Sequence, residues 1–247
     1  MKSIQLVALS ALVLSLGFTP ALSAESKPKY AASAVRLALD HEYINKSKAP
    51  DYWALSPYYV SQRDSSACSL ASFAMLLNAL KSSLNLTASD ELITQDKFVE
   101  KLKDHPAMKR FFMEKGKSIS LDEFAEIASR ALVVYGIKGF KVDAIHANGS
   151  RDFIRKTHDI LVENEVSSRN FIVANFLQSE FTGDEEGAVG HVAPVAAFDA
   201  RKSRVLIMDP DRVYYEPYWV SVDAFIKGMN TIDKDGGKTR GFLWIHE

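Results

Sequence analysis

The chain has 247 residues, a formal net charge of −1 at pH 7 and 47% hydrophobic residues, an ordinary composition for a folded globular protein. Its near-neutral charge gives no electrostatic basis for binding nucleic acid or an anionic membrane surface. The sequence contains one cysteine, which excludes an internal disulfide and a zinc site built on several cysteines. From the near-neutral charge we expect no nucleic-acid partner.

The first residues are typical of a secretory signal peptide. Met1 and Lys2 give a basic start, residues 4–18 are almost wholly apolar, and residues 19–24 offer small side chains for cleavage. An uncleaved anchor is the alternative, but the apolar run is short for a membrane span. The sequence thus predicts a signal peptide at 1–24, one catalytic domain at 25–247, a secreted or periplasmic location and no membrane attachment after cleavage.

Helical patterns dominate the first part of this domain. Residues 30–40 have a helical appearance, whereas residues 41–61 indicate an irregular but ordered segment. An apolar run at helical spacing then follows Ser65 and Ser66, which are good N-cap residues, and predicts a buried helix starting near Cys68. Three further helices each follow a capping residue: 95–103 after Thr94, 121–135 after Ser120 with Glu123 in a capping box, and 151–163 after Ser150.

The hydrophobic period changes after residue 170. An acidic, glycine-bearing loop is expected at 183–190, and helices followed by antiparallel strands predict an α+β fold of two lobes. The predicted strands cover 171–176, 191–198, 204–209 and 241–245, with a short helix over 221–229.

Cys68 falls in the first turn of its predicted helix. The partial positive charge of a helix N-terminus favours thiolate over thiol there. A lone free cysteine is usually a small buried core residue, so this position alone leaves both interpretations open. An unpaired cysteine in an oxidising compartment is a liability unless it is useful, which favours a nucleophile.

The turn at 199–203 gives a geometric argument for a histidine–aspartate pair. If Phe198 pairs with Arg204, His191 lies across from Asp211, and Asp209 is its diagonal neighbour on the same face. Diagonal Cβ atoms in a sheet are about 7–8 Å apart, which allows a hydrogen bond between the two side chains.

This argument depends on register, because a slip of one residue would put the two side chains on opposite faces. Pro194 indicates an edge strand or a bulge, and the alternatives are an ordinary strand histidine and a turn aspartate. With Cys68, the order of Cys68, His191 and Asp209 is that of papain-like thiol enzymes. Gln62 stands where such enzymes place an oxyanion-hole amide, and its alternative is a surface glutamine.

Four segments make the similarity more specific. Residues 68–80, 190–198, 206–220 and 229–242 resemble, in order, the motifs of the phytochelatin synthase family in its short bacterial form. The resemblance implies a papain-like fold with an N-terminal helical lobe and a C-terminal antiparallel sheet lobe. It also implies glutathione as substrate and a glutathione γ-glutamylcysteinyltransferase activity.

The resemblance further implies individual roles. The γ-glutamyl end of glutathione needs one anion for its ammonium group and a guanidinium for its carboxylate. Without the flanking match, a strand asparagine and a surface Asp–Arg pair are the alternatives. The implied catalytic residues are Cys68 as nucleophile, His191 as base, Asp209 as its orienter and Gln62 in the oxyanion hole; the implied substrate-binding residues are Asn175, Gly190, Asp233, Arg240 and Arg212, the last being structural or substrate-facing.

Some features depart from the family. Ala67 replaces an aromatic residue, Ser69 a glycine and Ala193 a serine. The plant members also carry a cysteine-rich C-terminal half, which we expect this protein to lack. We expect glycine release from glutathione, with the γ-Glu-Cys group passing mainly to water and to a lesser extent to a second glutathione.

The resemblance implies no intrinsic cofactor and no metal site in the protein. Heavy-metal ions such as cadmium or zinc are expected as thiolate complexes of the substrate, and a homodimer is left open. Two other functions remain as alternatives: a papain-like peptidase acting on other peptides, and a non-catalytic relative that holds peptides or metal thiolates.

Overall fold

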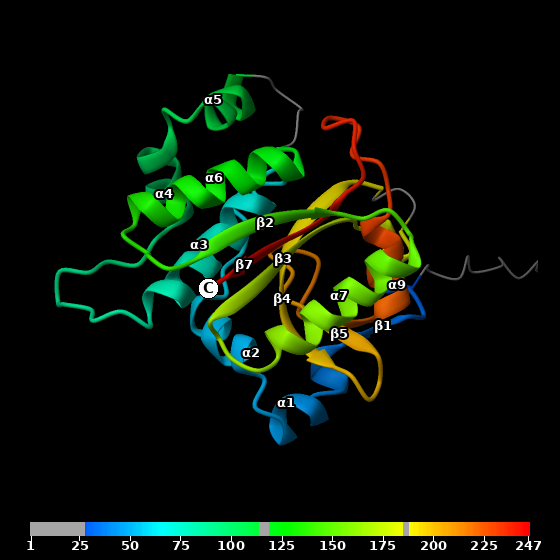
Figure 1. Ribbon diagram of the computed structural model, residues 1–247. Coiled ribbons are helices and arrows are strands. Elements are labelled where there is room, and N and C mark those ends of the chain that lie inside the picture. Colours follow the sequence, from blue (N-terminus) through cyan, green and yellow to red (C-terminus); the bar gives the residue numbers. More distant parts are fainter. Residues whose placement is uncertain (1–27, 114–118, 185–187) are drawn as a thin grey trace, which may run out of the picture.

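The computed structural model describes residues 28–113, 119–184 and 188–247. Within them, a seven-stranded sheet has the order β1-β6-β5-β4-β3-β7-β2, and neighbouring strands are antiparallel. Helices cover both of its faces (Figure 1). A mixed α+β fold is therefore confirmed. The predicted signal peptide and residues 185–187 of the predicted loop lie outside the described residues.

The elements have the following bounds. The strands are β1 (Ala34–Arg36), β2 (Lys141–His146), β3 (Asn170–Leu177), β4 (Gly190–Asp199), β5 (Arg204–Ile207), β6 (Tyr218–Ser221) and β7 (Gly241–His246). The α-helices are α1 (Glu42–Lys46), α2 (Pro50–Leu55), α3 (Cys68–Lys81), α4 (Gln95–Leu102), α5 (Pro106–Met113), α6 (Leu121–Val134), α7 (Arg151–Asn164), α8 (Ser179–Thr182) and α9 (Val222–Met229).

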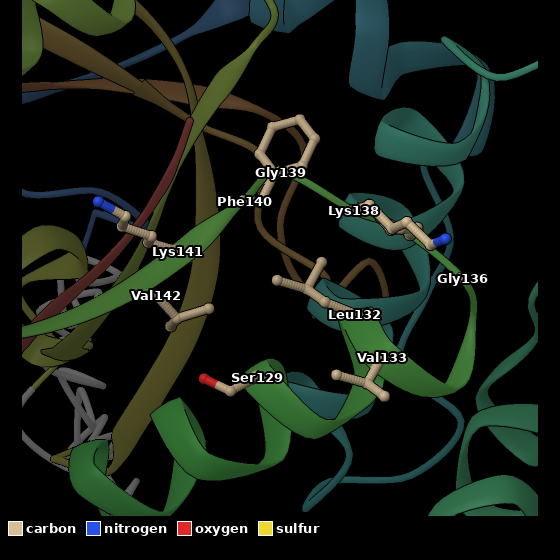
Figure 2. Close-up of a pocket in the computed structure, with 10 residues that line it drawn as sticks. Ser129, Leu132, Val133, Gly136, Lys138, Gly139, Phe140, Lys141 and Val142 are labelled. Atoms are coloured by element: carbon tan, nitrogen blue, oxygen red, sulfur yellow. The ribbon is translucent and has the colours of Figure 1, made fainter.

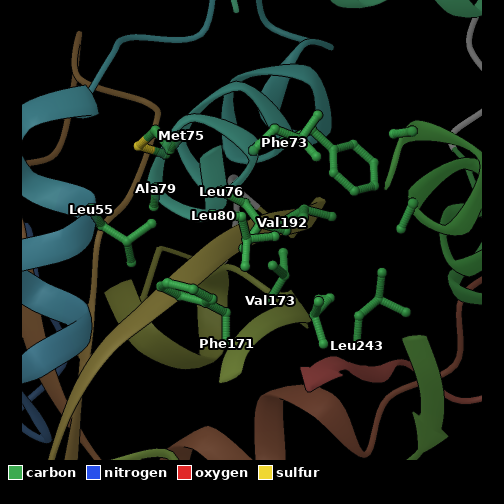
Figure 3. Packing of buried hydrophobic residues seen from close by; sticks show 14 of the residues in the cluster. Leu55, Phe73, Met75, Leu76, Ala79, Leu80, Phe171, Val173, Val192 and Leu243 are labelled. Carbon is green, nitrogen blue, oxygen red and sulfur yellow. The ribbon is translucent and has the colours of Figure 1, made fainter. Parts of the chain in front are cut away.

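Alternating residues of the central strands divide the interior into two apolar clusters. Phe171 and Val173 of β3 pack in a cluster with α3, α4 and α6, whereas Ile172 and Ala174 pack in a second cluster with α7 and α9. Figure 3 shows Phe171 and Val173 beneath the buried side chains of α3. Side chains of a strand alternate between faces, so one strand supplies both cores. The cysteine helix is thereby fixed directly on the sheet.

Helix capping follows the sequence closely. The side chains of Thr94, Ser120, Ser150 and Ser221 each accept a hydrogen bond from a backbone N–H in the first turn of the helix that follows. Ser120 also forms the predicted reciprocal capping box with Glu123. The predicted starts after Thr94, Ser120 and Ser150 are therefore confirmed, and the helix predicted over 221–229 begins one residue later, at Val222.

Two other predictions for the N-terminal part are wrong. Residues 30–40 do not form an α-helix but contain β1 and a 3-10 turn at Leu37–Leu39. β1 pairs with β6 at the edge of the sheet. Without β1, the backbone N–H and C=O groups along the outer side of β6 would have no strand to pair with. Residues 41–61 contain α1, α2 and a 3-10 turn rather than irregular structure.

The predicted caps of the cysteine helix are also wrong. The N-cap is Ala67, and it makes no side-chain cap. The backbone N–H and hydroxyl of Ser66 instead donate to Asp64 Oδ1, at 2.9 and 2.6 Å. Asp64 thus holds Ser66 in a tight turn before the helix, and α3 begins at Cys68 itself.

The hairpin register differs from the prediction at its turn and agrees with it further along. Asp199, rather than Phe198, pairs with Arg204. A register shift then brings Val195 opposite Ile207, which is the predicted alignment. The predicted alignment therefore applies at Val195 and Pro194, on the side of the shift that leads to the histidine.

Pro194 lies next to this register shift. β4 is an interior strand, so the edge-strand interpretation is wrong and the bulge interpretation is confirmed. Proline has no N–H to donate to a neighbouring strand, but its carbonyl still accepts from the Met208 N–H at 3.0 Å. Met208 immediately precedes Asp209, so this bond fixes the aspartate next to β4.

Candidate active site

Cys68 is the first residue of α3 and is half-buried. The helix is fastened to the sheet one turn later, where Ser72 Oγ donates to the Val192 carbonyl at 3.0 Å in a buried position. Val192 directly follows His191 on β4. The bond therefore fixes the cysteine helix against the strand that carries the histidine.

His191 and Asp209 form a buried pair. His191 Nε2 lies 2.7 Å from Asp209 Oδ1, and their exposed fractions are 4% and 0%. Cys68 is close enough to His191 to raise the pKa of the imidazole. Since Nε2 faces Asp209, Nδ1 is the ring nitrogen that remains for the thiol. The histidine therefore has both the thiol and the carboxylate as neighbours.

The two side chains shift each other's protonation in opposite directions. Burial lowers the pKa of His191, but Asp209 and Cys68 outweigh it and hold this pKa well above its ordinary value. Burial raises the pKa of Asp209, but His191, the Asp211 N–H and Tyr218 outweigh it and lower this pKa overall. The arrangement therefore favours an imidazolium beside a carboxylate.

Asp209 has partners for its carboxylate and its carbonyl. Oδ1 also accepts from the Asp211 N–H at 2.8 Å, and Oδ2 accepts from the Tyr218 hydroxyl at 2.8 Å. The Tyr59 hydroxyl donates to the backbone carbonyl of Asp209 at 2.6 Å. The carboxylate itself thus has three partners, His191, the Asp211 N–H and the Tyr218 hydroxyl. With these partners it stays ionised and keeps one orientation towards His191.

Gln62 lies on a loop tied to the same segment. Its backbone N–H donates to the Pro210 carbonyl at 2.7 Å. The side chain of Gln95 brackets this loop, because its Nε2 donates to the Ser61 carbonyl and its Oε1 accepts from the Arg63 N–H. The Gln62 Oε1 atom is buried and has no hydrogen-bond partner among the described residues.

A narrow cleft opens beside the thiol. Its open space is ≈ 40 Å³, room for about one water molecule. It brings together five residues that the sequence analysis selected. The lining residues are Ser66, Cys68, Ser69, Ile119, Asn175, Gly190, Val192, Asp233 and Arg240.

Arg240 crosses the wall of this cleft. One terminal nitrogen donates to the Ile232 carbonyl at 2.6 Å and the Thr231 hydroxyl at 3.1 Å, while Nε is buried without a partner in the described part of the chain. A Cβ at Gly190 would lie 3.0 Å from the other terminal nitrogen, so glycine leaves room for the guanidinium. Burial lowers the pKa of Arg240, opposed by Asp233 and Asp235.

Four selected residues lie outside the lining of this cleft: the buried pair His191 and Asp209, and also Gln62 and Arg212. Gln62 is half-buried. Arg212 is exposed, and its guanidinium stacks over the Tyr59 ring at 4.5 Å. The structure therefore places Arg212 against Tyr59, the residue that donates to the Asp209 carbonyl, rather than beside the thiol.

Sequence reasoning missed Ser72, Gln95 and Tyr218. Ser72 lies one helical turn after Cys68, so its spacing placed it on the same helix face. Gln95 and Tyr218 lie in segments that approach the site only through the tertiary fold. Gln95 opens a predicted helix and Tyr218 lies in the family-like segment 206–220, but no local pattern marks either of them as a partner of the site.

A larger hollow of ≈ 520 Å³ lies elsewhere, between the end of α6 and the start of β2. Leu132, Phe140 and Val142 surround it (Figure 2). It contains none of the selected residues, and its walls are mainly apolar. The smaller cleft beside Cys68 is therefore the candidate active site.

Fold and site together define an α+β protein in which a cysteine, a histidine and an aspartate lie beside a narrow cleft that also holds Asn175, Asp233 and Arg240. The family model for phytochelatin synthase matches residues 30–242, which is most of the chain. The chain therefore belongs to the phytochelatin synthase family.

Individual relatives agree with this assignment at low identity. The chain is 27% identical to glutathione gamma-glutamylcysteinyltransferase 1 of Lotus japonicus over 217 residues, covering 83% of this chain and 37% of that protein. For the protein of that name in Arabidopsis thaliana the identity is 25%, with 87% and 41% covered, and for the Schizosaccharomyces pombe enzyme it is 26%, with 82% and 45% covered. The chain thus spans less than half the length of these relatives.

Proposed function

We propose that this protein cleaves the Cys–Gly bond of glutathione through a thioester on Cys68. The observation that carries the proposal is the cleft itself. It combines the nucleophile with Asn175, Asp233 and Arg240, which offer the amide, anion and guanidinium that a free amino acid end requires. The names of the relatives point to the same γ-glutamylcysteinyl chemistry.

In the first step, the Cys68 thiolate attacks the carbonyl carbon of the Cys–Gly amide. The Cys68 N–H, at the start of α3, and the Gln62 side chain stabilise the resulting oxyanion. His191 gives its proton to the glycine nitrogen, the C–N bond breaks, and glycine leaves. A γ-glutamylcysteinyl thioester remains on Cys68.

In the second step, His191 takes a proton from the acceptor as it attacks the thioester. When the acceptor is water, the product is γ-glutamylcysteine. When the acceptor is a second glutathione, its amine attacks the thioester and the product is a longer peptide. In both cases the Cys68 thiolate is released. Asp209 keeps the imidazole ring oriented and favours its protonated form in the first step.

We propose water as the main acceptor. Arg240 is the one basic side chain in the lining of the cleft as the structure describes it, and it is assigned to the first substrate. A second glutathione would need its own cation to compete with water, because an acceptor gains from proximity only when the protein holds it. A time course of γ-glutamylcysteine and longer peptides, at millimolar glutathione with cadmium, separates the two products.

The cleft also supports a papain-like division into two lobes. Ser66, Cys68 and Ile119 come from the helical part of the chain, and Asn175 and Arg240 come from the sheet part. A substrate bound there would lie between the two parts.

The test of the function is glycine release from glutathione by wild type and by Cys68→Ala. Wild type should release glycine and the variant should not, with unchanged circular dichroism. Release by the variant near the wild-type rate would refute the nucleophile. A general peptidase would instead keep its activity on unrelated peptides after Arg240→Ala, and a non-catalytic relative would show no turnover at all.

We further propose export, because residues 1–24 have the pattern of a signal peptide. The mature protein should begin between Ser23 and Ala31, which N-terminal sequencing can check. No helix in the described residues is long and apolar enough to cross a membrane.

We propose that cadmium or zinc enters as a thiolate complex of the substrate. Across the ranges that the structure describes, no group of three or more His, Cys, Asp or Glu residues is placed to hold a metal ion. A homodimer stays a prediction of the sequence.

A further inference from the structure

The hairpin formed by residues 231–240, here the Arg240 hairpin, carries both charged residues of the cleft. It is closed by the Asp233 N–H donating to the Lys238 carbonyl and by the Arg240 N–H donating to the Thr231 carbonyl, each at 2.8 Å. These bonds set the shape of the hairpin. Its position relative to Cys68 needs contacts with other elements.

Asp122, in the first turn of α6, supplies one such contact. Its Oδ2 accepts from Lys238 Nζ at 2.6 Å, and its Oδ1 lies 2.9 Å from His146 Nε2. Lys238 and then His146 lower the pKa of Asp122, as expected for a carboxylate held by two donors. The carboxylate therefore joins the hairpin to α6.

His146, the last residue of β2, supplies the other contact. Its Nδ1 lies 2.5 Å from the Thr239 carbonyl, one residue before Arg240. Both atoms that face the ring nitrogens are acceptors, a carbonyl and a carboxylate. A neutral imidazole carries one N–H and satisfies one of them, whereas the protonated ring satisfies both.

The hairpin is also packed closely against the start of α6. A Cβ at Gly236 would lie 2.9 Å from the Cβ of Ser120, so glycine permits this approach. Ser120 follows Ile119, which lines the cleft. Movement of the hairpin on α6 would therefore change the width of the cleft.

We propose that Asp122, His146 and Lys238 form a positioning unit that holds Asp233 and Arg240 at the distance from Cys68 that an α-amino acid end requires. The inference rests on the proposed function, because it assigns the substrate's ammonium and carboxylate to these two residues. None of the three lies in the cleft lining. The unit therefore acts on binding of the γ-glutamyl end, and the chemistry at Cys68 is left unchanged.

Steady-state kinetics on glutathione test this division. His146→Gln and Asp122→Asn should each raise KM about five- to tenfold, because each removes partly exposed contacts of the hairpin. The kcat and the iodoacetamide labelling rate of Cys68 should stay within about twofold of the wild-type values. His246→Gln is the matched control, because its Nε2 lies 2.9 Å from Asp143 Oδ2 on the same two strands, away from the hairpin. Unchanged KM in His146→Gln, or an equal rise in His246→Gln, overturns the inference.

Hydrogen exchange keeps the test independent of turnover. The amides of Asp233 and Arg240 should exchange faster in His146→Gln than in wild type or His246→Gln. If wild type releases no glycine from glutathione, the proposed function fails, and the exchange rates alone decide the positioning. Equal exchange in the three proteins would overturn it.

Discussion

Replacing Asp209 by asparagine removes one buried charge and keeps the shape of the side chain. The Oδ1 of Asp209 accepts from His191 and from the Asp211 N–H, and an asparagine oxygen can accept from both. Its NH2 group would then face the Tyr218 hydroxyl, which can accept as well as donate. The variant therefore tests the charge at this position and leaves the geometry in place.

The main effect should fall on the pKa of His191. Burial lowers this pKa, and Asp209 and Cys68 hold it well above its ordinary value. An adjacent opposite charge moves a pKa by about 1–3 units, so Asp209→Asn should lower it by that amount. His191 must be protonated to give a proton to glycine, and it loses that proton as the pH rises through its pKa. The alkaline limb of kcat/KM should therefore move about 1–3 units to lower pH.

The assay is the pH dependence of kcat/KM for glycine release. Asp211→Asn is the matched control, because Asp211 carries the same charge and influences His191 only through space. Its alkaline limb should move much less. An alkaline limb that is unchanged in Asp209→Asn, or that moves equally in both variants, would refute the assigned role of the buried pair.

Three further changes test the cleft and its frame. Arg240→Ala should raise KM about 10- to 150-fold, since a charge-assisted contact contributes about 1.5–3 kcal/mol, while labelling of the thiol is unchanged. Gly241→Ala should lower the free energy of unfolding by at least about 3 kcal/mol, because its Cβ would lie 1.9 Å from the Ile145 carbonyl oxygen. Ser72→Ala should lower the free energy of unfolding by about 1–2 kcal/mol. It should also lower kcat more than it raises KM, since the bond to Val192 aligns the cysteine helix.

Each of these changes has a control. Arg212→Ala, outside the cleft, should leave KM close to wild type, and an equal rise in both arginine variants would count against the assignment. Gly136→Ala has open space for its Cβ but a positive φ, so it should lower the free energy of unfolding by less than Gly241→Ala does. Ser129→Ala removes an exposed helix bond and should not change kcat.

The sequence predicted those elements whose signals are local. Thr94, Ser120 and Ser150 marked helix starts because a cap acts within one turn of its helix. Segment 30–40 failed because its edge pairing with β6 depends on a strand far along the chain. β2 and β6 were missed, and their pairing is likewise set by distant strands.

The candidate site shows the same division. Cys68, His191 and Asp209 lie in segments that family motifs identify, and the structure brings their side chains together. Tyr218 reaches Asp209 only through the pairing of β5 with β6. Arg212 was selected from its motif, yet its stacking on Tyr59 depends on an approach that sequence spacing does not encode.

The position of β7 affects the order in which this protein can fold. Residues 241–246 form it, yet it lies between β3 and β2, and it is the strand with which β2 pairs. Such long-range pairing is slow, because loops must close before the contacts form. Arg240 directly precedes β7, so a nascent chain that lacks this strand would carry Cys68 without a finished cleft. Assembly of the thiol site is thereby postponed until β7 has been synthesised and has joined the sheet.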